Sequence, residues 1–393
     1  MAKDYTFKNT IPLAPLKIIA MENCAEFGKA VDDYIVGFRK NDQEILQQRE
    51  STIEFRGYDR DSYLVETSCP RFGSGEGKGM IHESVRGSDL FILSDVTNYS
   101  MTFPMYGKEH RMSPDDHYQD LKRIIATAMT SARRVNVIMP FLYESRQHKR
   151  TNRESLDCAM ALEELANMGV TNIITFDVHD PRVQNAIPLH DFDSFPVVYQ
   201  FMKALLGKDK DIPTDKNSLM IISPDEGAMG RAVYLANNLG VDVGMFYKRR
   251  DYSRVVNGKN PVVAHEFLGA DVEGKTCIII DDMIASGDSM LDTAKELKRR
   301  KAKRIIVCCT FGLFTSGLEN FDRYYNAGYF DYVITTNLNY RIPDLLTRPW
   351  YLEADMTKYV ATIINTLNHD VSLSSVMSHT EKLQRLIHNY RNS

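Results

Sequence analysis

The sequence has few of the features that mark membrane-spanning, secreted or zinc-binding proteins. Its 393 residues include 6 cysteines, and no two of them form a CxxC pair. Most of these cysteines lie in apolar stretches, which predicts reduced, buried thiols rather than a disulfide framework or a zinc site. No run of about 18 apolar residues occurs, which argues against a membrane-spanning helix. Met1–Pro15 lacks the charged, apolar and small residues of a signal peptide in their usual order, so we expect a cytoplasmic protein.

The sequence also lacks a strong excess of charge of one sign. It has 48 Lys and Arg residues against 52 Asp and Glu residues, a formal net charge of −4. This balance argues against a dedicated nucleic-acid-binding protein. Hydrophobic residues make up 43% of the chain and charged residues 25%, which is typical of a globular protein. The length predicts two or three domains.

Short apolar runs alternate with amphipathic helical stretches along the whole chain. This pattern predicts an α/β fold with mainly parallel sheets flanked by helices. Proline and aspartate cluster near Pro188–Pro213, so we expect two α/β domains, residues 1–195 and 196–393. Residues 40–61 and 98–116 are expected to be long polar connections or lids. The expected strands are Leu16–Met21, Ser62–Ser68, Leu90–Val96, Val135–Phe141, Asn172–Val178, Leu219–Ile222, Val243–Tyr247, Lys275–Ile280, Arg304–Cys309 and Tyr332–Thr336. The expected helices are Ala25–Arg39, His117–Ser131, Ser155–Met168, Ala228–Asn238, Met290–Arg300 and Met356–Asn368.

Open α/β sheets bind ligands at the carboxyl ends of their strands. Asp281 and Asp282 follow the expected strand Lys275–Ile280, and the small-residue loop 285–289 comes next, before a helix. The loop backbone and the helix N-terminus suit a phosphate. The carboxylates suit sugar hydroxyls or water-bound Mg²⁺. A sugar phosphate would fill both parts; the alternative is a capped turn between strand and helix.

Two further expected strands end in acidic residues. Asp177 and His179 follow one strand, and Asp225 follows another. An imidazole and a carboxylate from different strand ends could share a divalent ion. A strand-end Asp is about as often a turn or helix cap, so each signal is weak alone.

Two clusters of positive charge also follow expected strands. They are Lys248–Arg250 and Arg146–Arg150. Phosphoryl-type transfer needs cations around negatively charged oxygens, whereas one such cluster alone would be read as a solvated basic patch. The tract Phe72–Gly79 could be a glycine-rich phosphate cradle, although it lacks the GxxxxGK[ST] order of a Walker loop.

Together these segments resemble the ribose-phosphate pyrophosphokinase (phosphoribosyl pyrophosphate synthetase) family. The likeness begins near residue 70, and its motifs occur in the family order. Phe72–Glu76 resembles the FxDGE segment of the family, Glu83–Gly87 resembles its ESVRG stretch, and Arg146–Arg150 resembles its RQDRK segment. Three short segments, Asp177–His179, Ser223–Asp225 and Lys248–Arg250, resemble the family motifs DLH, SPD and KRR in that order. Asp281–Ser289 resembles the phosphoribosyl pyrophosphate motif, DDMIDTxGT.

The resemblance implies two phosphoribosyltransferase-like (type I) domains with the active site between them, in a homo-oligomer that is commonly a hexamer. It implies transfer of diphosphate from ATP to the C1 hydroxyl of ribose 5-phosphate, giving phosphoribosyl pyrophosphate and AMP, with Mg²⁺ as cofactor. The resemblance implies that Lys248 and Arg250 are catalytic and that His179 and Asp225 bind Mg²⁺. The residues that it implies for ATP binding are Phe72, Ser74, Gly75, Glu76, Arg146 and Gln147, with residues 74–76 binding the ATP of the adjacent subunit. Those that it implies for ribose 5-phosphate binding are Asp281, Asp282, Ala285, Ser286, Gly287, Asp288 and Ser289.

Several residues depart from the family pattern. Ala285 replaces an Asp, Asp288 replaces a small residue in the phosphate loop, and His148 replaces an Asp. The first two changes motivate an alternative, a catalytically weak or inactive regulatory relative. A phosphoribosyltransferase is a further alternative, but it gives the segments at 146–150 and 248–250 no role.

Overall fold

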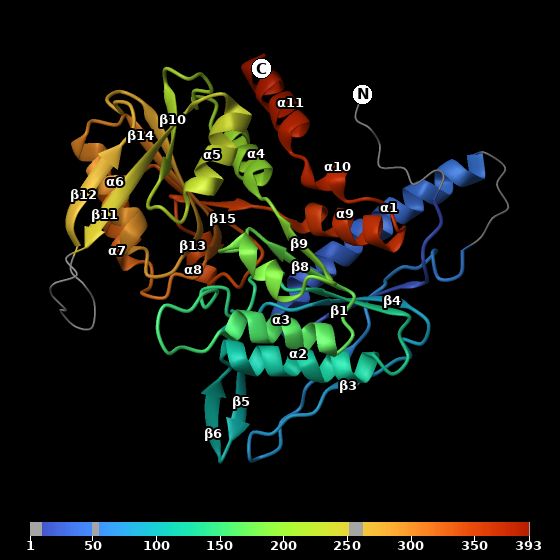
Figure 1. Cartoon of the computed structure of the whole chain (residues 1–393). Coiled ribbons are helices and arrows are strands. Elements are labelled where there is room, and N and C mark those ends of the chain that lie inside the picture. Colours follow the sequence, from blue (N-terminus) through green and yellow to red (C-terminus); the bar gives the residue numbers. More distant parts are fainter. Residues whose placement is uncertain (1–9, 49–54, 251–261, 393) are drawn as a thin grey trace. The chain divides into compact units, whose positions relative to one another are not determined.

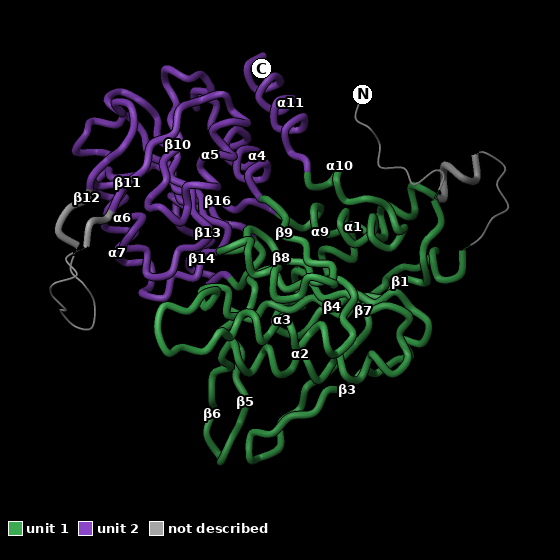
Figure 2. Tube along the Cα trace, viewed as in Figure 1, with its two compact units in different colours: residues 1–196, 337–340, 356–377 green, residues 197–336, 341–355, 378–393 purple. Residues whose placement is uncertain are grey.

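A computed structural model describes residues 10–48, 55–250 and 262–392. By their contacts, these residues divide into two compact units (Figure 2). Unit 1 comprises the residues up to 196 together with 337–340 and 356–377. Unit 2 comprises 197–336, 341–355 and the residues from 378 onward.

The centre of unit 1 is a five-stranded sheet in which all neighbouring strands are parallel. Its order is β1–β4–β7–β8–β9. Because β4 and β8 are buried throughout, they appear in the sequence as mainly apolar runs, DLFIL and NIITF, rather than as an alternating pattern. The strands are β1 (Leu16–Ala20), β4 (Asp89–Leu93), β7 (Arg134–Ile138), β8 (Asn172–Phe176) and β9 (Asp191–Phe195).

Helices cover both faces of this sheet. In Figure 1, α2 and α3 lie on one face, and α1 and α9 lie on the other. Their bounds are α1 (Ala25–Gln48), α2 (Pro114–Ala128), α3 (Asp157–Asn167) and α9 (Thr357–Asn368). Arg39 of α1 donates to Asn365 (3.2 Å) and Asn368 (2.6 Å) of α9. This buried pairing attaches a helix from late in the sequence to unit 1.

Unit 2 contains a seven-stranded sheet of order β12–β11–β10–β13–β14–β15–β16. Neighbouring strands are parallel except for the antiparallel pair β11–β12. The strands are β10 (Leu219–Ser223), β11 (Asp242–Arg250), β12 (Val262–Leu268), β13 (Thr276–Ile284), β14 (Arg304–Gly312), β15 (Tyr332–Thr336) and β16 (Tyr351–Ala354). The helices are α4 (Val198–Lys208), α5 (Met229–Leu239), α6 (Asp288–Arg299), α7 (Glu319–Asn326), α8 (Pro343–Leu346) and α11 (Thr380–Arg391).

The strand order of unit 2 contains a topological switch point. The chain leaves β10 through α5 toward β11, and it leaves β13 through α6 toward β14, in the opposite direction. β10 and β13 are themselves neighbours. In open parallel sheets, the carboxyl ends of two such strands flank a ligand-binding crevice. The topology therefore places a candidate site after residues 223 and 284.

Most predicted elements are present, and the α/β class is confirmed. Two regions differ from the expected polar connections. Residues 40–48 continue α1, and residues 98–116 contain the hairpin β5–β6 and the start of α2. The predicted strand Ser62–Ser68 is reduced to a bridge between Leu64 and Ile18 and the short β2. The remaining short elements are η1 (Glu22–Cys24), β2 (Thr67–Ser68), β3 (Met80–Ile81), β5 (Thr102–Met105), β6 (Lys108–Arg111), η2 (Pro181–Ala186) and α10 (Ser374–Met377).

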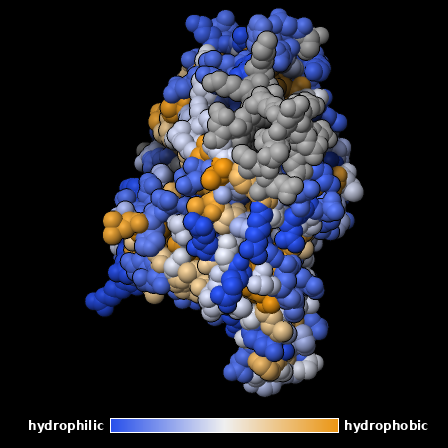
Figure 3. All heavy atoms as spheres, turned by 90° about the vertical axis from the view of Figure 1, so that its right-hand side faces the viewer, coloured by the Kyte–Doolittle hydropathy of each residue, from blue (hydrophilic) through white to orange (hydrophobic). Residues whose placement is uncertain are grey.

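Hydrophilic and hydrophobic residues are mixed on the face of the molecule that Figure 3 shows. On the face shown in Figure 3, hydrophobic residues form separate groups among hydrophilic ones. Within the described ranges, no helix has both the length and the apolar character needed to cross a membrane. All six cysteines are free thiols, as the sequence predicts.

Candidate active site

The candidate site of unit 2 begins with a pair of carboxylates on β13. The sequence places Asp281 and Asp282 after a strand that ends at residue 280, and this boundary is wrong. β13 continues to Ile284, because β14 also continues and pairs with it, with Asp281 opposite Cys309. Both carboxylates are thus held by a paired strand. Burial, followed by the charge of Asp282, raises the pKa of Asp281 well above its ordinary value.

A cation that the sequence analysis did not select lies beside these carboxylates. The Arg231 guanidinium, on the first turn of α5, is 3.7 Å from Asp282. Asp225, after β10, accepts the backbone N–H groups of Gly227 (3.0 Å) and Ala228 (3.3 Å). Asp225 therefore stabilises the turn that precedes α5, and its role as a metal ligand stays a prediction. Its charge also raises the pKa of Asp281. Arg231 carries no motif, but it lies six residues after Asp225 in the first turn of α5, and a search of the helix that follows the Ser-Pro-Asp segment would have found it.

The predicted phosphate loop, residues 285–289, follows β13 directly. Its backbone is joined to the segment after β14 because the N–H of Thr315 donates to the Ala285 carbonyl (2.9 Å). Gly287 has φ +91° and immediately precedes α6. A Cβ on this residue would lie 2.4 Å from the Phe321 ring. Both the conformation and the space therefore require glycine.

The side chains of this loop combine hydroxyls with one carboxylate. The Ser286 hydroxyl donates to Asp288 Oδ2 at 2.9 Å. Asp288 is the first residue of α6, where the helix dipole favours negative charge. A carboxylate of the chain thus occupies part of the anion-binding region in which the resemblance expects a phosphate.

The predicted catalytic pair Lys248 and Arg250 lies at the end of β11, the strand next to β10. Their backbone pairs with β12, with Lys248 opposite His265 and an irregularity in register between Arg249 and Arg250. The side chains of Lys248 and Arg250 lie outside the described residues, so their catalytic roles stay predictions.

In unit 1, the predicted metal ligand His179 follows β8. Asp177, directly after the strand, has φ +42°, a conformation that is uncommon for a residue other than glycine and concentrated at functional sites. The backbone N–H of Asp177 donates to the Phe195 carbonyl at the end of β9 (3.0 Å). This bond fixes the direction in which the chain leaves the sheet.

A contact between two side chains joins this segment to the predicted ATP-binding segment. His148 Nε2 lies 3.4 Å from the Asp180 carboxylate, and the His148 ring is 5.2 Å from the His179 ring. Hydrogen bonds from Arg182 lower the pKa of Asp180, with burial opposing them. His148, a departure from the family pattern, therefore has a local partner.

The neighbouring ATP-binding candidates are held differently from one another. Gln147 donates to the carbonyl of Ser155 at 2.7 Å, which closes the loop between β7 and α3. Arg146 is exposed. The other ATP-binding candidates form the turn 72–76, which lies between the bridged residues Arg71 and Gly77. In this turn the Ser74 hydroxyl donates to the Glu76 carboxylate (2.7 Å).

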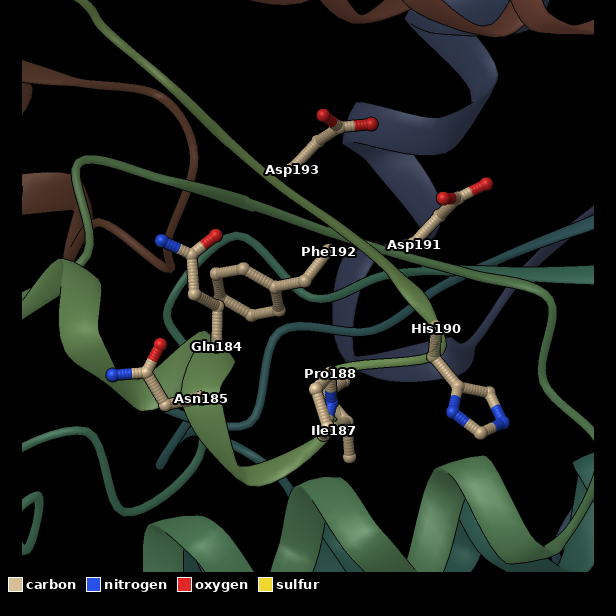
Figure 4. A pocket seen from close by; sticks show the side chains of 8 residues that line it. All are labelled: Gln184, Asn185, Ile187, Pro188, His190, Asp191, Phe192 and Asp193. Atoms are coloured by element: carbon tan, nitrogen blue, oxygen red, sulfur yellow. The ribbon is translucent and has the colours of Figure 1, made fainter.

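Unit 1 also has a pocket of about 400 Å³ beside η2 and β9. Figure 4 shows Asp191 and Asp193 projecting to one side of β9 and the Phe192 ring next to Gln184. Its lining residues are Gln184, Asn185, Ile187, Pro188, His190, Asp191, Phe192 and Asp193. None of them is a predicted site residue.

The residues present suit Mg²⁺ only as a partly hydrated ion. Among the described residues, no group of three or more His, Cys, Asp or Glu side chains is placed to hold a metal ion alone. The candidate site of unit 2 nevertheless brings the carboxyl groups of Asp225, Asp281 and Asp282 together, with Arg231 near Asp282. Mg²⁺ prefers oxygen ligands, keeps several waters, and usually binds through one or two carboxylates plus substrate phosphates. The donor set fits that mode of binding.

The fold and the candidate site of unit 2 define an α/β protein of the phosphoribosyltransferase type. Residues 16–169 match the family model for the N-terminal domain of ribose phosphate pyrophosphokinase, and residues 200–331 match the phosphoribosyl transferase domain. The crystal structure of phosphoribosylpyrophosphate synthetase from Mycobacterium smegmatis has the same fold. Its TM-score is 0.67 at 21% identity, covering 90% of this chain and 99% of that one.

The chain belongs to the ribose-phosphate pyrophosphokinase family. The ribose-phosphate pyrophosphokinase of Thermosipho africanus is 30% identical over 284 residues, which cover 71% of this chain and 81% of the relative. That of Vibrio cholerae is 27% identical over 321 residues, covering 80% and 92%. The family and the class of enzyme predicted from the sequence are thereby confirmed.

Proposed function

We propose that this chain transfers the β,γ-diphosphoryl group of ATP to the C1 hydroxyl of ribose 5-phosphate, giving phosphoribosyl pyrophosphate and AMP. The observation that carries this proposal is the position of Asp281, Asp282 and the loop 285–289 at the topological switch point of the unit 2 sheet. Membership of the ribose-phosphate pyrophosphokinase family supports the choice of reaction.

Each part of the candidate site in unit 2 has a role in this proposal. Asp281 and Asp282 accept hydrogen bonds from the ribose hydroxyls, and the loop 285–289 holds the 5-phosphate through N–H groups and hydroxyls. Lys248 and Arg250 stabilise negative charge on the diphosphoryl group as the C1 hydroxyl oxygen attacks the β-phosphorus. AMP leaves as the bond between the β-phosphorus and the oxygen that joins it to the α-phosphate breaks.

The side chains of unit 1 bind ATP in this proposal. Arg146 and Gln147 hold the nucleotide, joined by the turn 72–76 of an adjacent copy in a homo-oligomer, a hexamer by resemblance. His179 and Asp225 are the proposed protein ligands of Mg²⁺, which neutralises phosphate charge when bound. The cytoplasmic location and the domain boundary between residues 195 and 196 stay predictions.

The direct test is to mix the purified protein with ATP, Mg²⁺ and ribose 5-phosphate and to measure AMP. The expected result is AMP and phosphoribosyl pyrophosphate in equal amounts, dependent on both substrates and on Mg²⁺. No AMP at any concentration of inorganic phosphate would contradict the proposal. Conversion of phosphoribosyl pyrophosphate and a nucleobase, without reaction of ATP, would indicate a phosphoribosyltransferase instead.

A second candidate, a regulatory relative with weak activity, is favoured by one contact. The Asp288 carboxylate accepts the Ser286 hydroxyl inside the phosphate loop, where it would repel a phosphate. Asp288→Gly removes this charge. If the wild-type chain is inactive and Asp288→Gly forms AMP, the regulatory role is supported; if the wild type is active, the enzymatic role stands.

A further inference from the structure

The hairpin β5–β6 lies against the turn 72–76, and the proposed reaction gives this hairpin no role. Figure 1 shows the hairpin projecting beside α2 in unit 1. Its two strands are joined by Tyr106 and Gly107, whose φ values of +48° and +73° suit a two-residue type I′ turn. Two four-residue strands are marginally stable alone, so the hairpin depends on what it packs against.

Two contacts join the hairpin to the turn. The Tyr106 N–H donates to the Gly73 carbonyl at 2.9 Å. Met105 lies over Gly75, where a Cβ would be only 2.5 Å from the methionine sulfur. The alternation of exposure along β5 agrees with these contacts, because Phe103 and Met105 are half-buried while Thr102 and Pro104 are exposed.

The base of the turn is fixed from the opposite side. Phe103 lies 5.0 Å from the Arg71 guanidinium. Arg71 makes a bidentate pair with Asp120 of α2, at 2.6 and 2.8 Å, and both side chains are 5% exposed. Arg123 binds the same carboxylate at 2.6 Å. The turn 72–76 is thus held between an anchored base and the hairpin at its tip.

We infer that the hairpin β5–β6 sets the ATP-binding conformation of the turn 72–76, with Phe103 and Met105 as positioning residues. The inference rests on the proposed function, which assigns ATP binding to Ser74–Glu76. A turn that is ordered before ATP binds loses less conformational entropy on binding, so the hairpin increases ATP affinity without touching the reacting atoms.

Met105→Ala tests this inference, with Met105→Leu as the conservative variant. Glu109→Ala, an exposed residue on β6, is the matched control. We expect Met105→Ala to raise KM for ATP about tenfold while kcat changes by less than about twofold. KM for ribose 5-phosphate should stay near the wild-type value. Met105→Leu should restore KM for ATP, and amide hydrogen exchange of residues 72–77 should be faster only in Met105→Ala.

An unchanged KM for ATP in Met105→Ala would overturn the inference. So would equal losses in both KM values and kcat, because those would indicate a general structural role. If the wild-type chain forms no AMP, the proposed function fails, and hydrogen exchange then decides the role of the hairpin alone. Faster exchange of residues 72–77 in Met105→Ala would support that role, and unchanged exchange would refute it.

Discussion

Gly287→Ala should damage the phosphate loop and the core of unit 2 together. Gly287 has φ +91°, and the ideal Cβ position lies 2.4 and 2.5 Å from two carbons of the Phe321 ring. Phe321 cannot move aside easily, because it is fully buried and packs against Trp350 with ring centroids 5.6 Å apart. The substitution therefore forces a change either in the loop or in the core.

Two terms set the magnitude. The left-handed conformation costs a residue with a Cβ about 1–2 kcal/mol. Displacing a well-packed core ring to admit a methyl group costs about 1–3 kcal/mol. We therefore expect the free energy of unfolding of unit 2 to fall by roughly 2–5 kcal/mol.

The chain offers a local reporter for this measurement. Trp350 is the only tryptophan in the sequence and lies in the core of unit 2, so its fluorescence during urea unfolding follows that unit rather than the whole chain. Gly207→Ala, in α4 with no atom within 4 Å of the added Cβ, is the control and should gain up to about 1 kcal/mol.

KM for ribose 5-phosphate should also rise in Gly287→Ala but not in Gly207→Ala. Phe321→Leu in the Gly287→Ala background should recover part of the lost stability by making room. Wild-type stability together with a wild-type KM in Gly287→Ala would refute the argument, because the loop would then tolerate a side chain that the geometry excludes.

Three further outcomes are expected. Lys248→Ala should lower kcat by about 10²–10³ with little change in KM for ATP, measured by initial rates, because its charge acts in the transition state; near-wild-type kcat would remove its catalytic role. Arg231→Gln should raise KM for ribose 5-phosphate about tenfold at saturating ATP, because the cation beside Asp282 is lost; an unchanged KM would contradict this. Burial, aided by the charge of Arg39, lowers the pKa of His369 from 6.5 to about 4. The unfolded chain therefore binds a proton first as pH falls, and stability should drop by roughly 3 kcal/mol between pH 6.5 and 4. Urea unfolding followed by circular dichroism checks this slope. It should be shallower in His369→Gln but should not vanish, because burial also lowers the pKa of His379 to about 4.

The apolar strands could be predicted from the sequence because burial on both faces imposes continuous Val, Ile and Leu runs. The strand at Tyr332–Thr336 has the predicted bounds. The prediction failed where pairing, not composition, decides the conformation. Asp281 and Asp282 have the composition of a turn, and only pairing with β14 makes them part of a strand. The attachment of α9 to unit 1 depends on contacts of Arg39 more than 300 residues away along the chain.

The candidate site likewise contains residues that the sequence could predict and one, Arg231, that it could not. Its motifs could be recognised because chemistry restricts the residue types, whereas Arg231 acts through its position on a helix. The hairpin β5–β6 was missed because two four-residue strands give too short an alternation to separate from a polar loop.

The placement of Asp281 and Asp282 within β13 means that a paired strand holds the carboxylates of the candidate site in unit 2. A carboxylate on a flexible loop would lose conformational freedom each time it bound a sugar or a hydrated cation. Backbone pairing with β14 fixes the main chain of Asp281, and burial beside Asp282 makes a negative charge on Asp281 costly. In the proposed function, a ribose hydroxyl that donates to Asp281 reduces this cost, so the strand holds the carboxylate already ordered for its ligand. The predicted phosphate loop depends on a glycine rather than on strand pairing. Gly287 has a left-handed conformation directly before α6, which a residue with a Cβ would not readily adopt.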